Sequence, residues 1–278
     1  MAAPYASTGT AHRAGATPPA PAPARIELRN VSKRFARPGR LSQPLTVLSD
    51  VSLAIPEGTF VSLIGASGCG KTTMLRMMSG LVPYDEGSIQ INGTLVRGIP
   101  PSIGFVFQEP ALLPWRTVRQ NVAFALQQHP MDRRELEDRV SEKLRLANLQ
   151  DFGDYYPRML SGGMQQRVGL ARALVGDPDV LFMDEPLSAL DAFTRRRLQQ
   201  DIADIIESAS ATTVLVTHDV DEAIFFSDRI IVMGTPPASI REVVDVPLPR
   251  PRRHVDLLQN PVVAEIRDHV LGTVLGLA

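Results

Sequence analysis

The sequence predicts an α/β fold whose core is a mainly parallel sheet. Three observations support this expectation: short apolar runs alternate with helical patterns, a glycine-rich loop joins one run to a helix, and two acidic residues end another run. Strands that alternate with helices form parallel sheets, because each crossover helix returns the chain to the same end of the sheet. We also expect an antiparallel β portion near the N-terminus and a helical subdomain near 110–175.

The expected elements follow in order along the chain. Residues 25–35 and 45–55 alternate in part between apolar and polar and predict two strands, and Pro56-Glu57-Gly58 marks a turn. Four apolar runs predict buried strands, at 60–64, 179–184, 212–217 and 229–233. A helix is expected over 193–208. The stretch 131–147 predicts an amphipathic helix whose apolar side includes Leu136, Val140, Leu144 and Leu146.

The two ends of the chain differ in composition from the middle. Residues 1–24 are rich in alanine and proline, which predicts a disordered tail. The folded domain is expected over 25–249. Residues 250–278 form a short C-terminal extension with a helical pattern near 258–270, too short for a second regulatory domain.

Composition excludes several classes of protein. With 29 Lys and Arg against 30 Asp and Glu, the net charge is −1, which argues against a protein that coats nucleic acid through phosphate contacts. The single cysteine allows no internal disulfide and fits a reducing cytosol. No apolar run has the length of about 20 residues that a membrane-spanning helix needs.

A phosphate-binding loop follows the strand expected at 60–64. Its residues match the pattern G-x-x-x-x-G-K-[ST] and are Gly65, Ala66, Ser67, Gly68, Cys69, Gly70, Lys71 and Thr72, with Thr73 next. Glycines let several backbone N–H groups point at one phosphate chain, and the following helix presents its positive N-terminal end. Lys71 supplies a cation for the β- and γ-phosphates, and Cys69 is expected to contribute its backbone N–H. The alternative is a glycine turn with an incidental lysine.

The loop indicates a nucleotide but leaves the class of enzyme open, since kinases, GTPases and motor ATPases share it. The apolar run ending in Asp184 and Glu185 narrows the choice, because it places two carboxylates at the carboxyl edge of the sheet. We expect Asp184 and the Thr72 hydroxyl to hold Mg²⁺, and Glu185 to act as the general base on the attacking water. An ordinary strand end with two solvated acids is the alternative.

Two further polar residues end apolar runs. His218 follows 212–217 and could reach the γ-phosphate, and Gln108 follows Phe105-Val106-Phe107 and could ligate Mg²⁺ weakly. A second glycine site, Ser161, Gly162 and Gly163, precedes a helical pattern, with Ser161 as the expected N-cap. An ordinary capped helix is the alternative here.

Together these motifs resemble the ATP-binding subunits of ABC (ATP-binding cassette) transporters. The likeness covers about Arg25 to Pro249 and includes the phosphate loop, Gln108, the LSGGM segment 160–164, the strand 180–185, the segment 188–191 and His218, all in the family's order. The resemblance implies a P-loop NTPase fold and two copies that sandwich ATP. Lys71 of one copy and Ser161, Gly162, Gly163 and Asp191 of the other would hold the same nucleotide. Phe35 matches the aromatic residue that stacks on adenine.

Within the family, several segments are similar to the nitrate, sulfonate and taurine importer branch, namely 110–116, 121–122, 190–195 and 246–252. That branch implies ATP and Mg²⁺ as ligands, separate transmembrane permease subunits, and an extracytoplasmic substrate-binding protein that acts through the permease. It places the chain at the cytoplasmic face of the cell (inner) membrane. The transported anion stays open.

Other interpretations remain at this point. One alternative is an ABC ATPase that acts on DNA or ribosomes, but such proteins usually carry two cassettes or a long coiled coil. Another is a stand-alone P-loop kinase, which would not need the LSGGM segment at 160–164. Trp115 either contacts a permease or packs inside the helical subdomain. The basic clusters 195–197 and Arg250, Arg252 and Arg253 are expected to be solvated faces.

Overall fold

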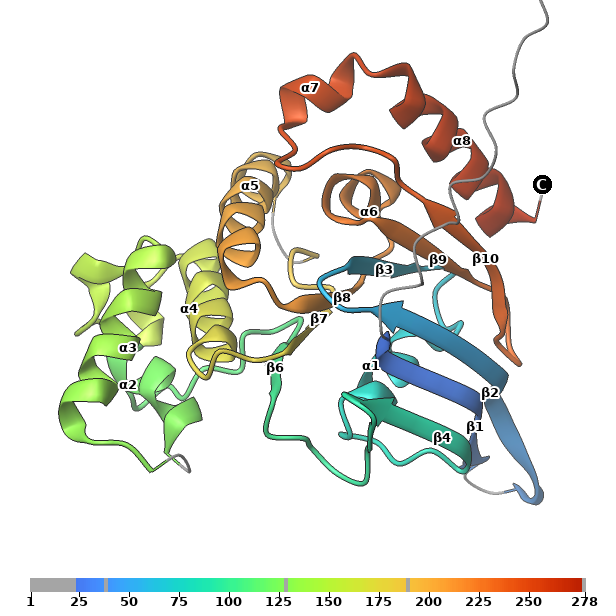
Figure 1. The fold of residues 1–278 in the computed structure, drawn as a ribbon, viewed down its shortest axis with the longest axis horizontal. Helices are drawn as coiled ribbons and strands as arrows, with labels where there is room; N and C mark the ends of the chain where they lie inside the picture. Colours follow the sequence, from blue (N-terminus) through green and yellow to red (C-terminus); the bar gives the residue numbers. More distant parts are fainter. Residues whose placement is uncertain (1–23, 38–39, 128–129, 189–190, 277–278) are drawn as a thin grey trace, which may run out of the picture.

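The structure is a computed structural model that describes residues 24–37, 40–127, 130–188 and 191–276. The expected tail before Ala24 therefore lies outside the described residues, as do positions 189 and 190. Figure 1 shows three parts: a central sheet with helices around it, a second sheet beside α1, and a helical lobe that includes α2, α3 and α4. This arrangement confirms the predicted fold class.

The central sheet has the strand order β10-β9-β3-β8-β7-β6. Its strands are β3 (Phe60–Ile64), β6 (Ile103–Val106), β7 (Val180–Asp184), β8 (Thr212–Val216), β9 (Arg229–Met233) and β10 (Ile240–Asp245). All pairings are parallel except that of β10 with β9. Every residue of β3, β7 and β8 is buried, which explains why these strands appear in the sequence as continuous apolar runs.

The second sheet is antiparallel, as expected for the N-terminal region, and has the order β2-β1-β4-β5. Its strands are β1 (Ala24–Arg37), β2 (Arg40–Pro56), β4 (Glu86–Ile91) and β5 (Thr94–Leu95). Ile26 on β1 lies opposite Ile55 on β2 and Ile91 on β4, so one face is apolar. That face packs on α1 (Lys71–Met78) through Met74, Leu75 and Met78.

The helical lobe contains the helices expected between 110 and 175. They are α2 (Val118–Ala123), η1 (Phe124–Leu126), α3 (Arg133–Leu146), η2 (Gln150–Phe152), η3 (Pro157–Met159) and α4 (Gly162–Leu174). Val140 and Leu144 of α3 are buried against α4, but Leu146 is exposed, so its predicted place on the apolar side is wrong. Leu146 is the last residue of α3.

The remaining helices come from the C-terminal half of the chain and pack around the central sheet. They are α5 (Ala192–Ala209), α6 (Val220–Phe226), α7 (His254–Leu258) and α8 (Pro261–Leu275). Val263, Ile266 and Val270 of α8 pack with residues of α6 and β9 in one apolar cluster. None of the described helices is long and apolar enough to cross a membrane.

Arg252 ties the C-terminal segment to this core, which corrects the expectation of a solvated basic face. Its side chain is almost fully buried, and its guanidinium donates to the carbonyl oxygens of Ile224 (2.7 Å), Ser227 (2.7 Å) and Leu248 (2.8 Å). A guanidinium carries five N–H donors, so it can satisfy several carbonyls that end helices and strands. Arg250 is partly buried and pairs with Asp228, whereas Arg253 is exposed, as expected, and pairs with Asp204.

Candidate functional site

The order of strands in the central sheet brings the predicted site residues to one edge. Strands β3, β8, β7 and β6 are neighbours and parallel, so their carboxyl ends lie in a row. The phosphate loop follows β3, His218 follows β8, Asp184 and Glu185 end β7, and Gln108 lies just beyond β6. This edge is where ligands bind in open α/β sheets.

The loop between β3 and α1 has the backbone shape that its glycines permit. Gly68 and Gly70 have φ angles of 77° and 98°, in the left-handed region. A Cβ on Gly70 would also lie 3.1 Å from Val47 Cγ1. The Cys69 N–H donates to Ala66 O at 3.2 Å in this structure, and its contact with a phosphate stays a prediction. The Cys69 side chain is buried.

Lys71 is a buried cation at the start of α1. The residue is 6% exposed, and its Nζ donates to the carbonyl oxygens of Gly65 (2.9 Å) and Ala66 (3.1 Å). No carboxylate of the described residues lies within ion-pair distance of this ammonium. A buried charge without a counterion is costly, so this position favours an anion close to Lys71.

A pocket of about 420 Å³ opens beside the loop. It is lined by Val47, Ser67, Gly68, Gly70, Lys71, Thr72, Thr73, Glu185 and His218. Six of these nine residues belong to the loop that was predicted to bind nucleotide. Glu185 and His218 were predicted to act on the attacking water and on the γ-phosphate. Val47, on β2, was not foreseen, because only the packing of the two sheets brings it to the loop.

Asp184 lies beneath the loop and is nearly buried. Its carboxylate accepts a hydrogen bond from Thr72 Oγ1 at 2.9 Å and faces Arg76 Nη2 at 3.4 Å. Mg²⁺ usually takes one or two protein oxygens together with substrate phosphates, and the adjacent hydroxyl and carboxylate fit that pattern. No cluster of three or more His, Cys, Asp or Glu within the described ranges could hold a metal by itself.

Glu185 and His218 face each other across the pocket. His218 Nδ1 lies 3.3 Å from Glu185 Oε2, and the His218 side chain is 61% exposed. Glu185 has a φ of 44°, unusual for a residue with a Cβ, and its N–H donates to Val216 O on β8 at 3.0 Å. Such backbone conformations persist only where the surroundings hold them, and they cluster at functional sites.

Ser188 links two of the predicted residues and was not identified from the sequence as a contact. Its hydroxyl accepts from Gln108 Nε2 at 3.2 Å and donates to the Glu185 carbonyl oxygen at 3.0 Å. Gln108 therefore reaches the Glu185 turn through one hydroxyl, although it does not line the pocket.

The residues predicted to act on a partner's nucleotide lie away from the pocket. Ser161 caps α4 by accepting from Met164 N, and Gly162 and Gly163 form the first turn. Asp191 caps α5 by accepting from the N–H groups of Phe193 and Thr194, and the bond from Thr194 is the main reason why its pKa is lowered. Phe35, on β1, is exposed and also lies outside the pocket lining.

Glu222, in the first turn of α6, lies behind His218 and was missed by the sequence analysis. Its carboxylate accepts a hydrogen bond from Thr217 Oγ1, which in turn accepts from Asp219 N at 3.1 Å. These bonds span His218. Burial raises the pKa of Glu222 to about 7, and its Oε1 is buried with no partner in the described chain. The available signal was an acidic residue directly before the apolar stretch AIFF at 223–226.

We expect Glu222→Gln to remove a pH dependence of stability. Because the folded-state pKa exceeds the ordinary value, the protonated form stabilises the fold fully below about pH 4.5, and this stability is lost as pH rises toward 7. The loss is on the order of 3 kcal/mol. Glutamine cannot ionise, so the variant should gain stability relative to wild type between pH 5 and pH 8.

The measurement is urea unfolding of both proteins across that range. Glu265→Gln is the control, because Glu265 is exposed on α8. A stability difference between wild type and Glu222→Gln that stays constant from pH 5 to 8 would show that Glu222 does not titrate in the folded protein.

Comparison with known proteins gives three results. The family model described as "ABC transporter" matches residues 48–188. An aliphatic sulfonates import ATP-binding protein from Bacillus cereus is 42% identical, with 82% of this chain and 88% of that protein covered. A taurine import ATP-binding protein from Jannaschia is 40% identical over 90% of this chain and 93% of its own length.

A nitrate import ATP-binding protein from Synechococcus elongatus is 44% identical over 81% of this chain, but this chain spans only 35% of that longer protein. Among solved structures, a dimeric ATP-binding cassette in a post-hydrolysis state bound to ADP and Pi has a TM-score of 0.69 and 33% identity. The match covers 80% of this chain and 98% of that one.

Proposed function

Because this chain belongs to the ABC transporter family, in which the cassette is an ATPase, we propose that it powers an importer of a small anion. The observation that carries the nucleotide part is Lys71, a buried cation that faces a 420 Å³ pocket without a carboxylate partner in the described chain. The names of the relatives support the import part, since they include nitrate, sulfonate and taurine importers.

The phosphate chain of ATP would lie along the loop. Lys71 would leave the carbonyls of Gly65 and Ala66 and bind the β- and γ-phosphates, while backbone N–H groups of 67–72 and the α1 N-terminus face the same charge. Phe35 would stack on the adenine. Mg²⁺, held by Thr72 and Asp184 and more weakly by Gln108, would neutralise phosphate charge.

Two copies would complete the site. Within one chain, Ser161, Gly162, Gly163 and Asp191 do not line the Lys71 pocket, yet they form two capped helix starts. Helix N-termini bind phosphate through free N–H groups, so these starts suit the nucleotide of a second copy. The dimeric cassette structure, similar in fold at 33% identity, supports this arrangement.

Hydrolysis needs a base beside the attacking water. Glu185 lines the pocket next to His218, so its carboxylate could accept the proton of a water held between the two side chains. His218 would hydrogen-bond the γ-phosphate. Loss of that phosphate would be passed to the segment before α2 through hydrogen bonds, because the Ser188 hydroxyl bonds both to Gln108 and to the Glu185 carbonyl oxygen.

The surface that passes this motion to a permease would include Trp115. The indole is 71% exposed, so the alternative that it packs inside the helical lobe is wrong. Trp115 lies between Gln108 and α2, and Asn121 fixes this segment by donating to the Leu113 and Arg116 carbonyls at 3.1 Å. We propose permease subunits at this face, a substrate-binding protein beyond them, and a position at the cytoplasmic side of the inner membrane.

A deletion strain tests the import assignment. We expect it to lose growth on one of an alkanesulfonate, nitrate or taurine as the sole sulfur or nitrogen source, and the full chain to copurify with a permease. Wild-type chain should restore growth and Glu185→Gln should not. Unchanged growth on all three sources, with copurification of ribosomes or DNA instead of a permease, would contradict an importer and favour a cassette that acts on nucleic acid.

A further inference from the structure

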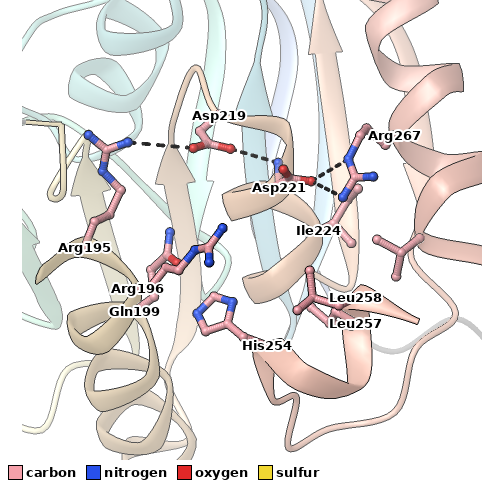
Figure 2. A pocket seen from close by; sticks show the side chains of 11 residues that line it. Arg195, Arg196, Gln199, Asp219, Asp221, Ile224, His254, Leu257, Leu258 and Arg267 are labelled. Carbon is pink, nitrogen blue, oxygen red and sulfur yellow. Dashed lines mark hydrogen bonds and ion pairs between the residues drawn. The ribbon is translucent and has the colours of Figure 1, made fainter. Parts of the chain in front are cut away.

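A second pocket lies outside the nucleotide site, between the α5–α6 pair and the C-terminal helices. It has a volume of about 220 Å³ and is shown in Figure 2. Residues of α5, α6, α7 and α8 line it, so its walls come from segments more than 60 positions apart in the sequence. This volume is about half that of the pocket beside the phosphate loop, so it suits a smaller ligand.

Two of the three arginines in the pocket are already neutralised. Arg267 pairs with Asp221 at 2.6 Å, and Arg195 faces Asp219 at 4.0 Å; Figure 2 draws both contacts. Arg196 has no such partner, since no carboxylate of the described residues lies within ion-pair distance of it. The pocket therefore keeps one positive charge that its own acids do not balance.

Gln199 adds an amide to the donors that line the pocket. The residue is 5% exposed and lines the pocket one helical turn beyond Arg196, yet none of the described residues hydrogen-bonds its side-chain amide. Its amide atoms are open to the pocket space, so the two N–H donors can bind an anion that enters it. In Figure 2, the side chains of Arg196 and Gln199 lie next to each other on α5, above the ring of His254.

The opposite wall adds a ring nitrogen and an apolar surface. His254 stacks on Phe225 with 4.2 Å between ring centroids, and its Nε2 has no partner in the described part of the chain. Burial lowers the pKa of His254. Ile224, Leu257 and Val263 form the apolar part.

We propose that this pocket binds a small organic oxyanion, with its charged head on Arg196 and Gln199 and a short hydrocarbon part against Ile224, Leu257 and Val263. A planar guanidinium beside an amide gives several N–H donors for sulfonate or carboxylate oxygens. The occupant would touch the segment that carries His218, because Asp219 follows that residue and forms part of the pocket wall. The site is separate from the transport assignment and requires neither ATP nor a permease.

Calorimetric titration of the full chain, without nucleotide and at constant ionic strength, tests the site. The probes are butane-1-sulfonate, inorganic sulfate and 1-butanol. We expect saturable binding of butane-1-sulfonate, at least tenfold weaker binding of sulfate, and none of butanol. Equal affinity for sulfate and butane-1-sulfonate would overturn the amphiphilic ligand, and the absence of saturable binding of either anion would overturn the site.

Variants locate the binding. Arg196→Gln and Gln199→Leu should each weaken butane-1-sulfonate at least tenfold, whereas Arg197→Gln, an exposed neighbour on α5 that does not line the pocket, should change it less than twofold. An equal loss in the Arg196 and Arg197 variants would indicate unspecific attraction to the basic helix and overturn the proposal.

A spectroscopic readout is independent of affinity. An anion near an imidazole favours its protonated form, so the ligand should raise the pKa of His254 in an NMR titration. Asp219, Asp221, Arg195, Arg196 and Arg267 are the charged groups that line the same pocket. No change in the His254 titration at saturating butane-1-sulfonate would place the ligand elsewhere.

Discussion

Replacing Glu185 by glutamine is expected to leave ATP binding intact and to lower kcat by about 10²- to 10⁴-fold, the usual contribution of a positioned general base. The amide keeps the size and one acceptor oxygen of the side chain but cannot take a proton from water. Nothing else changes in the phosphate loop, where Lys71 and Thr72 hold their own contacts. Single-turnover ATPase assays with a parallel nucleotide-binding measurement give the result.

The same variant should accumulate as a dimer with ATP, because unhydrolysed nucleotide would keep two copies together. Adding Ser161→Arg to it is the matched test, since Ser161 lies at a helix start outside the chain's own pocket. We expect the double variant to bind ATP as a monomer in size-exclusion chromatography. Near-normal turnover of Glu185→Gln would remove Glu185 as the base, and a persistent dimer in the double variant would contradict the shared site.

Exposed Glu265 on α8 again provides the control. Glu265→Gln should match wild type in turnover and in oligomeric state, so that loss of one carboxylate by itself explains neither effect.

Features encoded in short segments were predictable from the sequence. The loop 65–72, the acidic end of β7 and the cap at Ser161 each lie within a few residues of the strand or helix that positions them. Parallel pairing then brings the strand ends together, because the alternation of strand and helix fixes which edge of the sheet they occupy. The order of strands was not part of that prediction, and it is what places Glu185 beside His218.

Residues whose role depends on distant partners were missed or misjudged. Arg252 lies in a basic, proline-rich stretch typical of a surface, but its carbonyl acceptors Ile224 and Ser227 lie more than 20 positions away. Glu222 becomes a buried acid only because α6 packs against β3 and α8. Ser188 follows the acidic strand end as an ordinary turn residue, and only the neighbouring position of β6 brings Gln108 to its hydroxyl.

Lys71→Ala should abolish ATP binding at concentrations that saturate wild type, which corresponds to a loss of affinity on the order of 100-fold or more. Hydrogen bonds from a cation to phosphate oxygens contribute about 1.5–3 kcal/mol each, and Lys71 is the loop's only cationic side chain. Without nucleotide, the variant should be as stable as wild type or slightly more stable, because it removes a buried charge that only two carbonyl oxygens accept.

Thermal unfolding with and without ATP separates these two effects. Wild type should gain about 2.7 kcal/mol when ATP is present at 100 times its Kd, and the variant should gain nothing at the same concentration. Lys143→Ala is the control, since Lys143 lies on α3 and pairs with Asp177 at 2.7 Å, away from the loop. If Lys71→Ala keeps the ATP-dependent rise in Tm, the phosphate chain does not lie along residues 65–72, because no other side chain of that loop carries a positive charge to hold it.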